Sequence, residues 1–172
     1  MTPLVPERLK TARLHLRPLE EPDWRTLHEH YADPVCTRFT FGRTLSEGES
    51  WRALASLVGH WVLRGFGPYG VEERSSGALL GVVGLWHPND WPGPEIKWLL
   101  LRRHWGRGFA SEAALAVRRM SARTLPDMPL ISLIHADNSL SIKTARAIGG
   151  AFERELAFRG GRWVVYRHLR DP

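Results

Sequence analysis

The chain has 172 residues and a formal net charge of +6, with 43% hydrophobic and 24% charged residues. These proportions are ordinary for a globular domain, and no stretch approaches the ~20 apolar residues that cross a bilayer, so we expect one domain over residues 1–172 and no membrane contact. Its positive charges are scattered rather than grouped in a run, which argues against a nucleic-acid partner.

The N-terminus lacks the apolar core of a signal peptide, so we expect a cytoplasmic protein. The single cysteine, Cys36, excludes an internal disulfide and offers no cysteine cluster for a metal. A lone cysteine can be a nucleophile, but a small buried residue is the simpler interpretation.

The N-terminal half is expected to contain a strand, two helices and a hairpin. Apolar and polar residues alternate over residues 12–17, which is the period of a half-buried strand. Trp24, Leu27 and Tyr31 recur at helical spacing. Ser46 and Glu49 have the form of a capping box, which opens a further helix. The elements expected here are a strand at 12–17, helices at 22–33 and 46–64, and strands at 69–73 and 78–86.

The C-terminal half alternates strands and helices after a loop at 87–94 that is rich in proline and glycine. The elements expected here are strands at 95–101, 130–135, 152–158 and 162–168, and helices at 108–123 and 138–148. A strand–helix–strand order needs a parallel crossover, whereas the hairpins are antiparallel. The pattern therefore predicts an α+β fold with one parallel crossover in a mostly antiparallel sheet.

Residues 95–113 carry the clearest functional signal. A strand leads through a short loop with Gly106 and Gly108 directly into a helix. Glycines let the backbone approach a ligand closely, and the first N–H groups of a helix, with its dipole, attract anions. The loop is too short for a P-loop, and Ser111 stands where a Rossmann motif has its third glycine. A tight turn with no ligand is the alternative interpretation.

The run Trp105-Gly106-Arg107-Gly108-Phe109-Ala110 resembles motif A of the GNAT N-acetyltransferase superfamily, Gln/Arg-x-x-Gly-x-Gly/Ala. With the Ser-Glu-Ala that follows, it is similar to the RimJ/RimL branch of ribosomal-protein N-terminal acetyltransferases. Other segments fall in family order, so the resemblance covers nearly the whole chain: 13–18, 80–85, 94–96, 137–141 and 148–152. It implies the GNAT fold, with about seven strands flanked by helices, and acetyl transfer from acetyl-CoA to a primary amine.

The resemblance also implies how acetyl-CoA binds. Main-chain amides from Arg107 to Ser111 would hold the pyrophosphate, the strand edge at 99–101 would pair with the pantetheine amides, and Asn138 would bond the same arm. Two residues depart from the family pattern, because Trp105 replaces a polar residue and Lys97 stands where the branch often has glycine. No metal is expected. The expected acetyl-CoA contacts are Leu99, Leu100, Leu101, Arg102, Arg103, Arg107, Gly108, Phe109, Ala110, Ser111, Asn138 and Ser141.

Aminolysis of a thioester needs a neutral amine and a proton for the leaving thiolate. An amine with a pKa near ~10 is charged at neutral pH, so a base must accept its proton. Glu95 occupies the Glu-Ile-Gly position of the family and is the expected base, and Ser141 is the expected acid. The alternative interpretations are an ordinary strand-end carboxylate for Glu95 and a serine that merely sits in the first turn of a helix for Ser141. The alternatives are Glu72, Glu73 or His135 for the base and Tyr166 for the acid.

The acceptor is the part that the sequence determines least. A protein N-terminus and a small amine, such as an amino sugar, polyamine or antibiotic, both remain open, as does a non-catalytic CoA-binding or sensing module. The front helices and the loop at 87–94, with Trp86 and Trp91, are expected to form the wall of the acceptor site. Monomer and homodimer are both compatible with the sequence.

Overall fold

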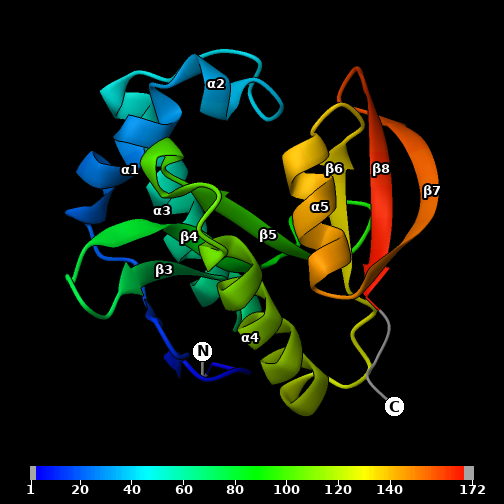
Figure 1. The fold of residues 1–172 in the computed structure, drawn as a ribbon, viewed down its shortest axis with the longest axis horizontal. Coiled ribbons are helices and arrows are strands. Elements are labelled where there is room, and N and C mark those ends of the chain that lie inside the picture. Colours follow the sequence, from blue (N-terminus) through cyan, green and yellow to red (C-terminus); the bar gives the residue numbers. More distant parts are fainter. Residues whose placement is uncertain (1–2, 169–172) are drawn as a thin grey trace.

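The computed structural model describes residues 3–168, which form one eight-stranded sheet (Figure 1). The strands are β1 (Leu9–Lys10), β2 (Leu14–Arg17), β3 (Pro68–Glu73), β4 (Leu79–Trp86), β5 (Glu95–Leu100), β6 (Ile131–His135), β7 (Gly150–Phe158) and β8 (Gly161–His168). Their order in the sheet is β1-β2-β3-β4-β5-β6-β8-β7. Every neighbouring pair is antiparallel except β5 and β6, which are parallel.

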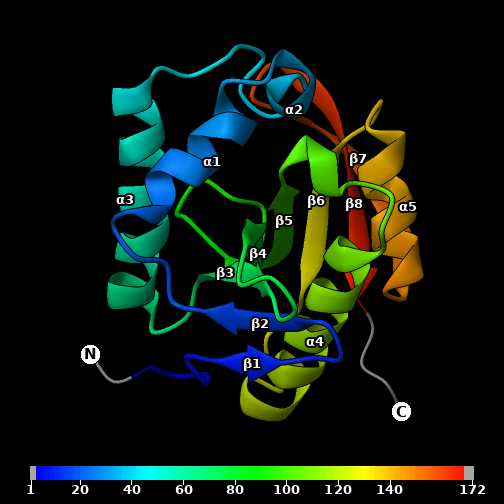
Figure 2. The same cartoon turned by 60° about the vertical axis from the view of Figure 1, so that its left-hand side comes forward.

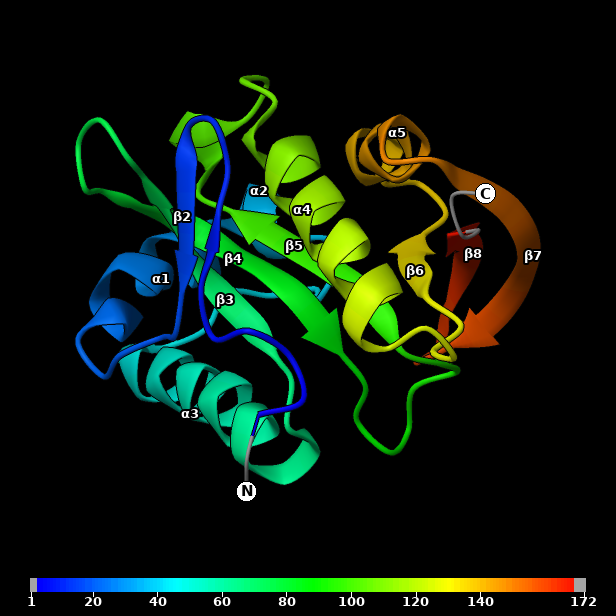
Figure 3. The same cartoon turned by 90° about the horizontal axis from the view of Figure 1, so that it is seen from below.

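Helices cover both faces of the sheet, α1 and α3 on one and α4 and α5 on the other (Figures 2 and 3). Their bounds are α1 (Asp23–Tyr31), α2 (Pro34–Thr37), α3 (Glu47–Arg64), α4 (Phe109–Thr124) and α5 (Ser139–Ala147), with a 3₁₀ helix, η1 (Arg102–His104), before α4. Central strand β4 is buried on both faces: Val83 packs in the core beneath α4, and Val82 packs against α1 and α3. None of the described helices is both long and apolar enough to cross a membrane.

The predicted α+β class and the single parallel crossover are confirmed. Ser46 caps α3 in a full capping box with Glu49, as its spacing indicates. The sheet has one strand more than the seven expected, because the two-residue β1 pairs with β2. The short helices α2 and η1 were not predicted, since each is too brief to show a helical period.

Strands β5 and β6 meet only at one end. Their one registered pair is Glu95 with Ile131, and the Ile131 N–H donates to the Pro94 carbonyl at 2.9 Å. Just beyond this point side chains replace the main-chain ladder. The Ser132 hydroxyl donates to the Ile96 carbonyl at 2.9 Å, and the Leu133 N–H donates to Glu95 Oε2 at 3.1 Å. The edge of β5 that faces away from β4 is therefore left without a strand partner toward Leu100.

The pairing of β4 with β5 depends on Gly81. Its φ is +149°, and an added Cβ would lie 2.2 Å from the Leu99 carbonyl oxygen. We expect Gly81→Ala to lower the free energy of unfolding by roughly 2–4 kcal/mol, through overpacking and an unfavourable φ.

Gly59 in α3 is the matched control, because its added Cβ meets nothing within 4 Å. Gly59→Ala should raise stability by about 0.5–1 kcal/mol, since alanine favours a helix interior. Urea denaturation of both variants measures the two effects. A loss of stability in Gly59→Ala, or no loss of stability in Gly81→Ala, would contradict the packing described.

Candidate functional site

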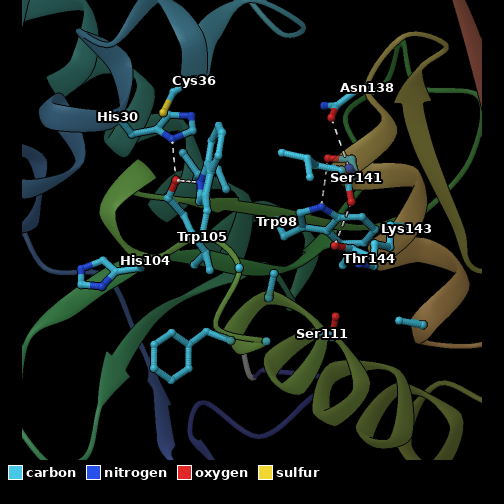
Figure 4. A pocket seen from close by; sticks show the side chains of 18 of the residues that line it. His30, Cys36, Trp98, His104, Trp105, Ser111, Asn138, Ser141, Lys143 and Thr144 are labelled. Atoms are coloured by element: carbon cyan, nitrogen blue, oxygen red, sulfur yellow. Dashed lines mark hydrogen bonds between the residues drawn. The ribbon is translucent and has the colours of Figure 1, made fainter.

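A cavity of about 400 Å³ lies where β5 and β6 separate (Figure 4). It is lined from one side by β5, the glycine loop and the first turn of α4, and from the other by α5. At one end His30 of α1, Cys36 of α2 and Thr40 also line it. The structure therefore brings the predicted glycine loop, strand edge and α5 residues to a single cavity.

The first residues of α4 line this cavity, and within residues 3–168 their main-chain amides have no helical or capping partner. Gly106 and Gly108 have left-handed φ values of +74° and +77°, which favour glycine. Among the described residues no side chain caps α4, and its first backbone bond runs from Glu112 N–H to the Gly108 carbonyl at 3.0 Å. The N–H groups of residues 109–111 precede that bond and have no helical partner. Such amides, together with the helix dipole, are the groups that can hold an anion, and this helix start is called the anion site below.

Arg107 lies beside this helix start but does not line the cavity. Its guanidinium lies 4.6 Å from the centre of the Phe109 ring and 3.2 Å from Glu73 Oε1. Arg13, which sequence reasoning missed, lies over the same ring at 4.5 Å, bonds the Arg107 carbonyl and forms an ion pair with Glu112. Both guanidinium groups therefore lie close to the helix start, but each is already paired with a carboxylate, Glu112 or Glu73.

Arg102 and Arg103 lie elsewhere. Arg102 Nη1 is 3.6 Å from Asp33 Oδ2, and Arg103 is paired with Glu29 of α1. Neither side chain lines the cavity, although their sequence positions placed them in the expected phosphate site. Carboxylates contributed by the α1–α2 region, distant in sequence, bind these two arginines instead.

The predicted strand edge at 99–101 is available only in part. Leu99 and Leu100 line the cavity, whereas the Leu101 N–H donates to the Leu80 carbonyl at 2.9 Å and so cannot pair with a ligand. Backbone groups alternate in direction along a strand, so the Leu100 N–H and the Trp98 carbonyl face away from β4. The Leu100 carbonyl already accepts bonds from Trp105 Nε1 at 2.9 Å and His30 Nδ1 at 3.0 Å.

Helix α5 places Asn138 and Ser141 on the opposite wall. Asn138 Oδ1 accepts the Ser141 N–H at 3.2 Å, so it caps α5 and leaves its amide group to donate. Trp98 Nε1 donates to Ser141 Oγ at 3.3 Å, across the separation of the strands. Because Ser141 accepts this bond, its own O–H can donate to a group in the cavity.

Glu95 does not line the cavity. Its side chain is buried, and one carboxylate oxygen holds the Leu133 N–H at the point where β5 and β6 part. Burial raises the pKa of Glu95 to about 7, while Lys97 and the Leu133 amide act in the opposite direction. Desolvation also lowers the pKa of Lys97, whose Nζ lies 4.5 Å above the Trp86 ring.

The other candidates for acid or base also lie outside the cavity lining. Glu72 is paired with Arg17 at 2.9 Å, and Glu73 is paired with Arg107. His135 stacks on Phe39 and accepts the Asp137 N–H at 3.2 Å. Tyr166 is buried among apolar residues near α5. Within residues 3–168, no group of three or more His, Cys, Asp or Glu side chains is arranged to hold a metal ion.

His30 and Trp105 are cavity residues that sequence reasoning did not assign a role. Trp105 was noted only as a departure from the family motif, and His30 occupies the buried face of α1 with Leu27 and Tyr31. A histidine on an otherwise apolar helix face is the signal that could have singled out His30. His30 and Leu100 are 70 residues apart in the sequence, so no local pattern shows that they are in contact.

Glu95 should make stability depend on pH. Its folded pKa of about 7 exceeds the ordinary 4.5, so the folded protein binds more protons between these values and the free energy of unfolding falls as pH rises. A shift of this size corresponds to roughly 3 kcal/mol. Relative to Glu95→Gln, the wild type should lose about that much from pH 4.5 to 7.5, measured by urea denaturation. If the free energy of unfolding changed with pH in the same way in both proteins, the raised pKa of Glu95 would be contradicted.

Comparison with known proteins agrees with this geometry. The model of the acetyltransferase (GNAT) domain family matches residues 13–151. An uncharacterized N-acetyltransferase of Bacillus licheniformis, p20, is 29% identical over 150 residues, covering 80% of this chain and 83% of that protein. An acetyltransferase structure from Agrobacterium tumefaciens is 31% identical, with a TM-score of 0.83 and 94% of each chain covered.

A further solved structure shares the fold at low identity. It is that of RimL, a ribosomal L7/L12 alpha-N-protein acetyltransferase, in complex with coenzyme A. The identity is 17%, the TM-score is 0.76, and 96% of this chain and 97% of that chain are covered. The family match spans most of the sequence, and the chain therefore belongs to the GNAT family of acetyl-CoA-dependent N-acetyltransferases.

Proposed function

We propose that this protein transfers the acetyl group of acetyl-CoA to a primary amine by direct attack in a ternary complex, and that the amine is a protein N-terminus. The observation that carries the proposal is that the unbonded amides of α4 and the unpaired edge of β5 line the same cavity. RimL, which shares the fold, is an α-N-protein acetyltransferase, and this supports an N-terminal amine as the first acceptor to test.

The cavity has the donors and acceptors that coenzyme A needs. The amides of residues 109–111, next to the left-handed Gly108, suit a pyrophosphate. The Leu100 N–H and Trp98 carbonyl can pair with the amides of a pantetheine arm in the manner of an added strand. The Asn138 side-chain amide lies on the facing wall and can donate to the same arm. These groups would align an acetyl thioester along β5.

Bound acetyl-CoA supplies an activated acyl group, and the chain supplies orientation and proton transfer. The Trp98 N–H faces away from β4 like the carbonyl of the same residue, and it can donate to the acyl oxygen, where negative charge develops, while the Leu100 N–H pairs with the pantetheine arm. The Ser141 O–H, on the α5 side, would protonate the sulfur as it leaves. Ser141 is held for this role by its bond from Trp98 Nε1 at 3.3 Å.

Glu95 stays a prediction as the base. A pKa of about 7 suits proton transfer at neutral pH. Its carboxylate is buried outside the cavity lining and holds the Leu133 N–H, so it would act only through intervening water. Its loss should therefore affect stability at the strand junction as well as turnover.

The anion site is tested by obstructing it. We expect Gly108→Val to weaken acetyl-CoA binding at least tenfold in calorimetry. A branched side chain would lie beside the amides, and valine disfavours the left-handed backbone conformation that leads into α4. Gly160→Val in the β7–β8 turn is the control, since Gly160 has a similar φ of +74° but does not line the cavity. Undiminished affinity in the Gly108 variant would count against the anion site.

The acceptor and the role of Ser141 are tested together. Thioester consumption is followed with peptides bearing a free N-terminal serine or alanine, and with spermidine, glucosamine and an aminoglycoside. Turnover of the peptides supports a protein N-terminus as the acceptor. Turnover of the small amines alone would mean that the acceptor is a small amine instead. Tight acetyl-CoA binding without any turnover would indicate a sensing module.

On the best acceptor, Ser141→Ala should lower kcat by roughly 10²-fold, the usual scale for losing a general acid, with acetyl-CoA affinity within threefold. Ser139→Ala is the matched control in the same helix turn, since Ser139 is exposed and does not line the cavity. Equal kinetics for the two variants would remove Ser141 from the mechanism.

A further inference from the structure

His30 lies at the α1 end of the cavity and reaches from the helix to the edge of β5. Its Nδ1 is 3.0 Å from the Leu100 carbonyl oxygen. A carbonyl oxygen can only accept, so Nδ1 must carry the proton of this bond. The other ring nitrogen, Nε2, then bears the lone pair of a neutral imidazole. In Figure 4 a dashed line leaves one nitrogen of the His30 ring, which is the Nδ1 bond to the Leu100 carbonyl, and Nε2 is the ring nitrogen that this bond does not use.

The surroundings of His30 keep the ring uncharged. Burial lowers its pKa below 6.5, the Leu100 bond acts in the opposite direction, and Lys97 of β5 lowers it while Asp33 raises it. The Cys36 thiol lines the cavity beside it, and burial raises the pKa of that thiol to about 11. The ring of Tyr31 meets it edge-on at 5.5 Å, and burial raises the pKa of this phenol as well. At neutral pH the imidazole is therefore the base among these groups.

The position of this ring is fixed by the separation of the strands. In a continuous sheet the Leu100 carbonyl would face the next strand, but β6 has already diverged. His30 and Trp105 donate to it instead. The imidazole is thus held at the strand edge along which the acyl group is proposed to lie. Ser141 stands on the other wall of the same cavity (Figure 4).

We infer that His30 Nε2 is the general base that takes the proton from the acceptor amine, an assignment that rests on the function proposed above. The amine enters as an ammonium ion with three N–H bonds and leaves as an amide with one. His30 accepts the first proton and passes it to solvent. The neutral nitrogen then forms the N–C bond as the C–S bond breaks. Ser141 gives its proton to the sulfur and regains one from the nitrogen, so the protons balance.

His30 and Glu95 differ in what they can reach. The His30 ring lines the cavity, and its proton-accepting nitrogen is not used by the bond to Leu100. The Glu95 carboxylate lies outside that lining and holds β6 to β5 through Leu133. If His30 is the base, substituting His30 should slow turnover most. If Glu95 is the base, substituting Glu95 should slow it most.

The test is His30→Asn, because an asparagine amide can take the place of Nδ1–H toward Leu100 but has no basic nitrogen. On the peptide or small amine of the panel that the wild type acetylates, kcat at pH 7 should fall about 10²-fold or more. Acetyl-CoA affinity should stay within threefold. The remaining rate should rise about tenfold per pH unit toward the pKa of the amine, since only the neutral amine then reacts.

His28→Asn is the matched control. His28 lies in the same helix, bonds Ser50 Oγ at 2.8 Å through Nδ1, and does not line the cavity. Its turnover and pH profile should match those of the wild type. A shared loss in both variants would mean that α1 is simply damaged, and would overturn the assignment.

A readout on the protein alone is nitrogen NMR of the histidine rings, with the His30 signals identified by their absence from His30→Asn. We expect an Nδ1–H tautomer that gains its second proton below pH 6.5. An Nε2–H tautomer, or wild-type turnover and pH profile in His30→Asn, would overturn the role of His30 while acetyl transfer itself stands. A wild type that binds acetyl-CoA but acetylates no amine would instead overturn the proposed function.

Discussion

The site depends on one constraint, the parting of β5 from β6 in the middle of the sheet. Main-chain N–H and C=O groups in a protein interior need partners, so an unpaired strand edge there must be satisfied in another way. Near the junction, Ser132 and Glu95 supply the missing bonds from their side chains. At the far end His30 and Trp105 bind the Leu100 carbonyl. Between these ends the Leu100 N–H and Trp98 carbonyl remain for a ligand.

The same parting explains why the proposed acetyl-CoA site and the proposed acceptor site meet. Helix α4 follows β5 directly, so its uncapped start lies beside the strand edge, and α5 follows β6 and covers the other wall. Trp98 spans the separation to reach Ser141. Helix α1 closes one end with His30. An amine that reaches an acyl group aligned along β5 would meet the proposed base at this end of the cavity and the proposed acid on the α5 wall.

Local patterns predicted much of this arrangement. Alternation, helical period, the Ser46 capping box and the glycines before α4 each involve neighbouring residues, and the corresponding elements are present. Contacts between distant segments were not predictable in the same way. Arg102 and Arg103 stand next to the glycine loop in sequence, but carboxylates near α1 bind them. The bond between His30 and Leu100 spans 70 residues, and the role of Glu95 at the strand junction depends on where β6 lies.

The most direct measurement of the central claim is a crystal structure of the protein with coenzyme A. We expect pyrophosphate oxygens at hydrogen-bond distance, roughly 2.7–3.2 Å, from the amides of residues 109–111, with the pantetheine arm running along β5 between Trp98 and Leu100. Coenzyme A bound elsewhere, or amides at the start of α4 that bond to the protein itself, would contradict this claim.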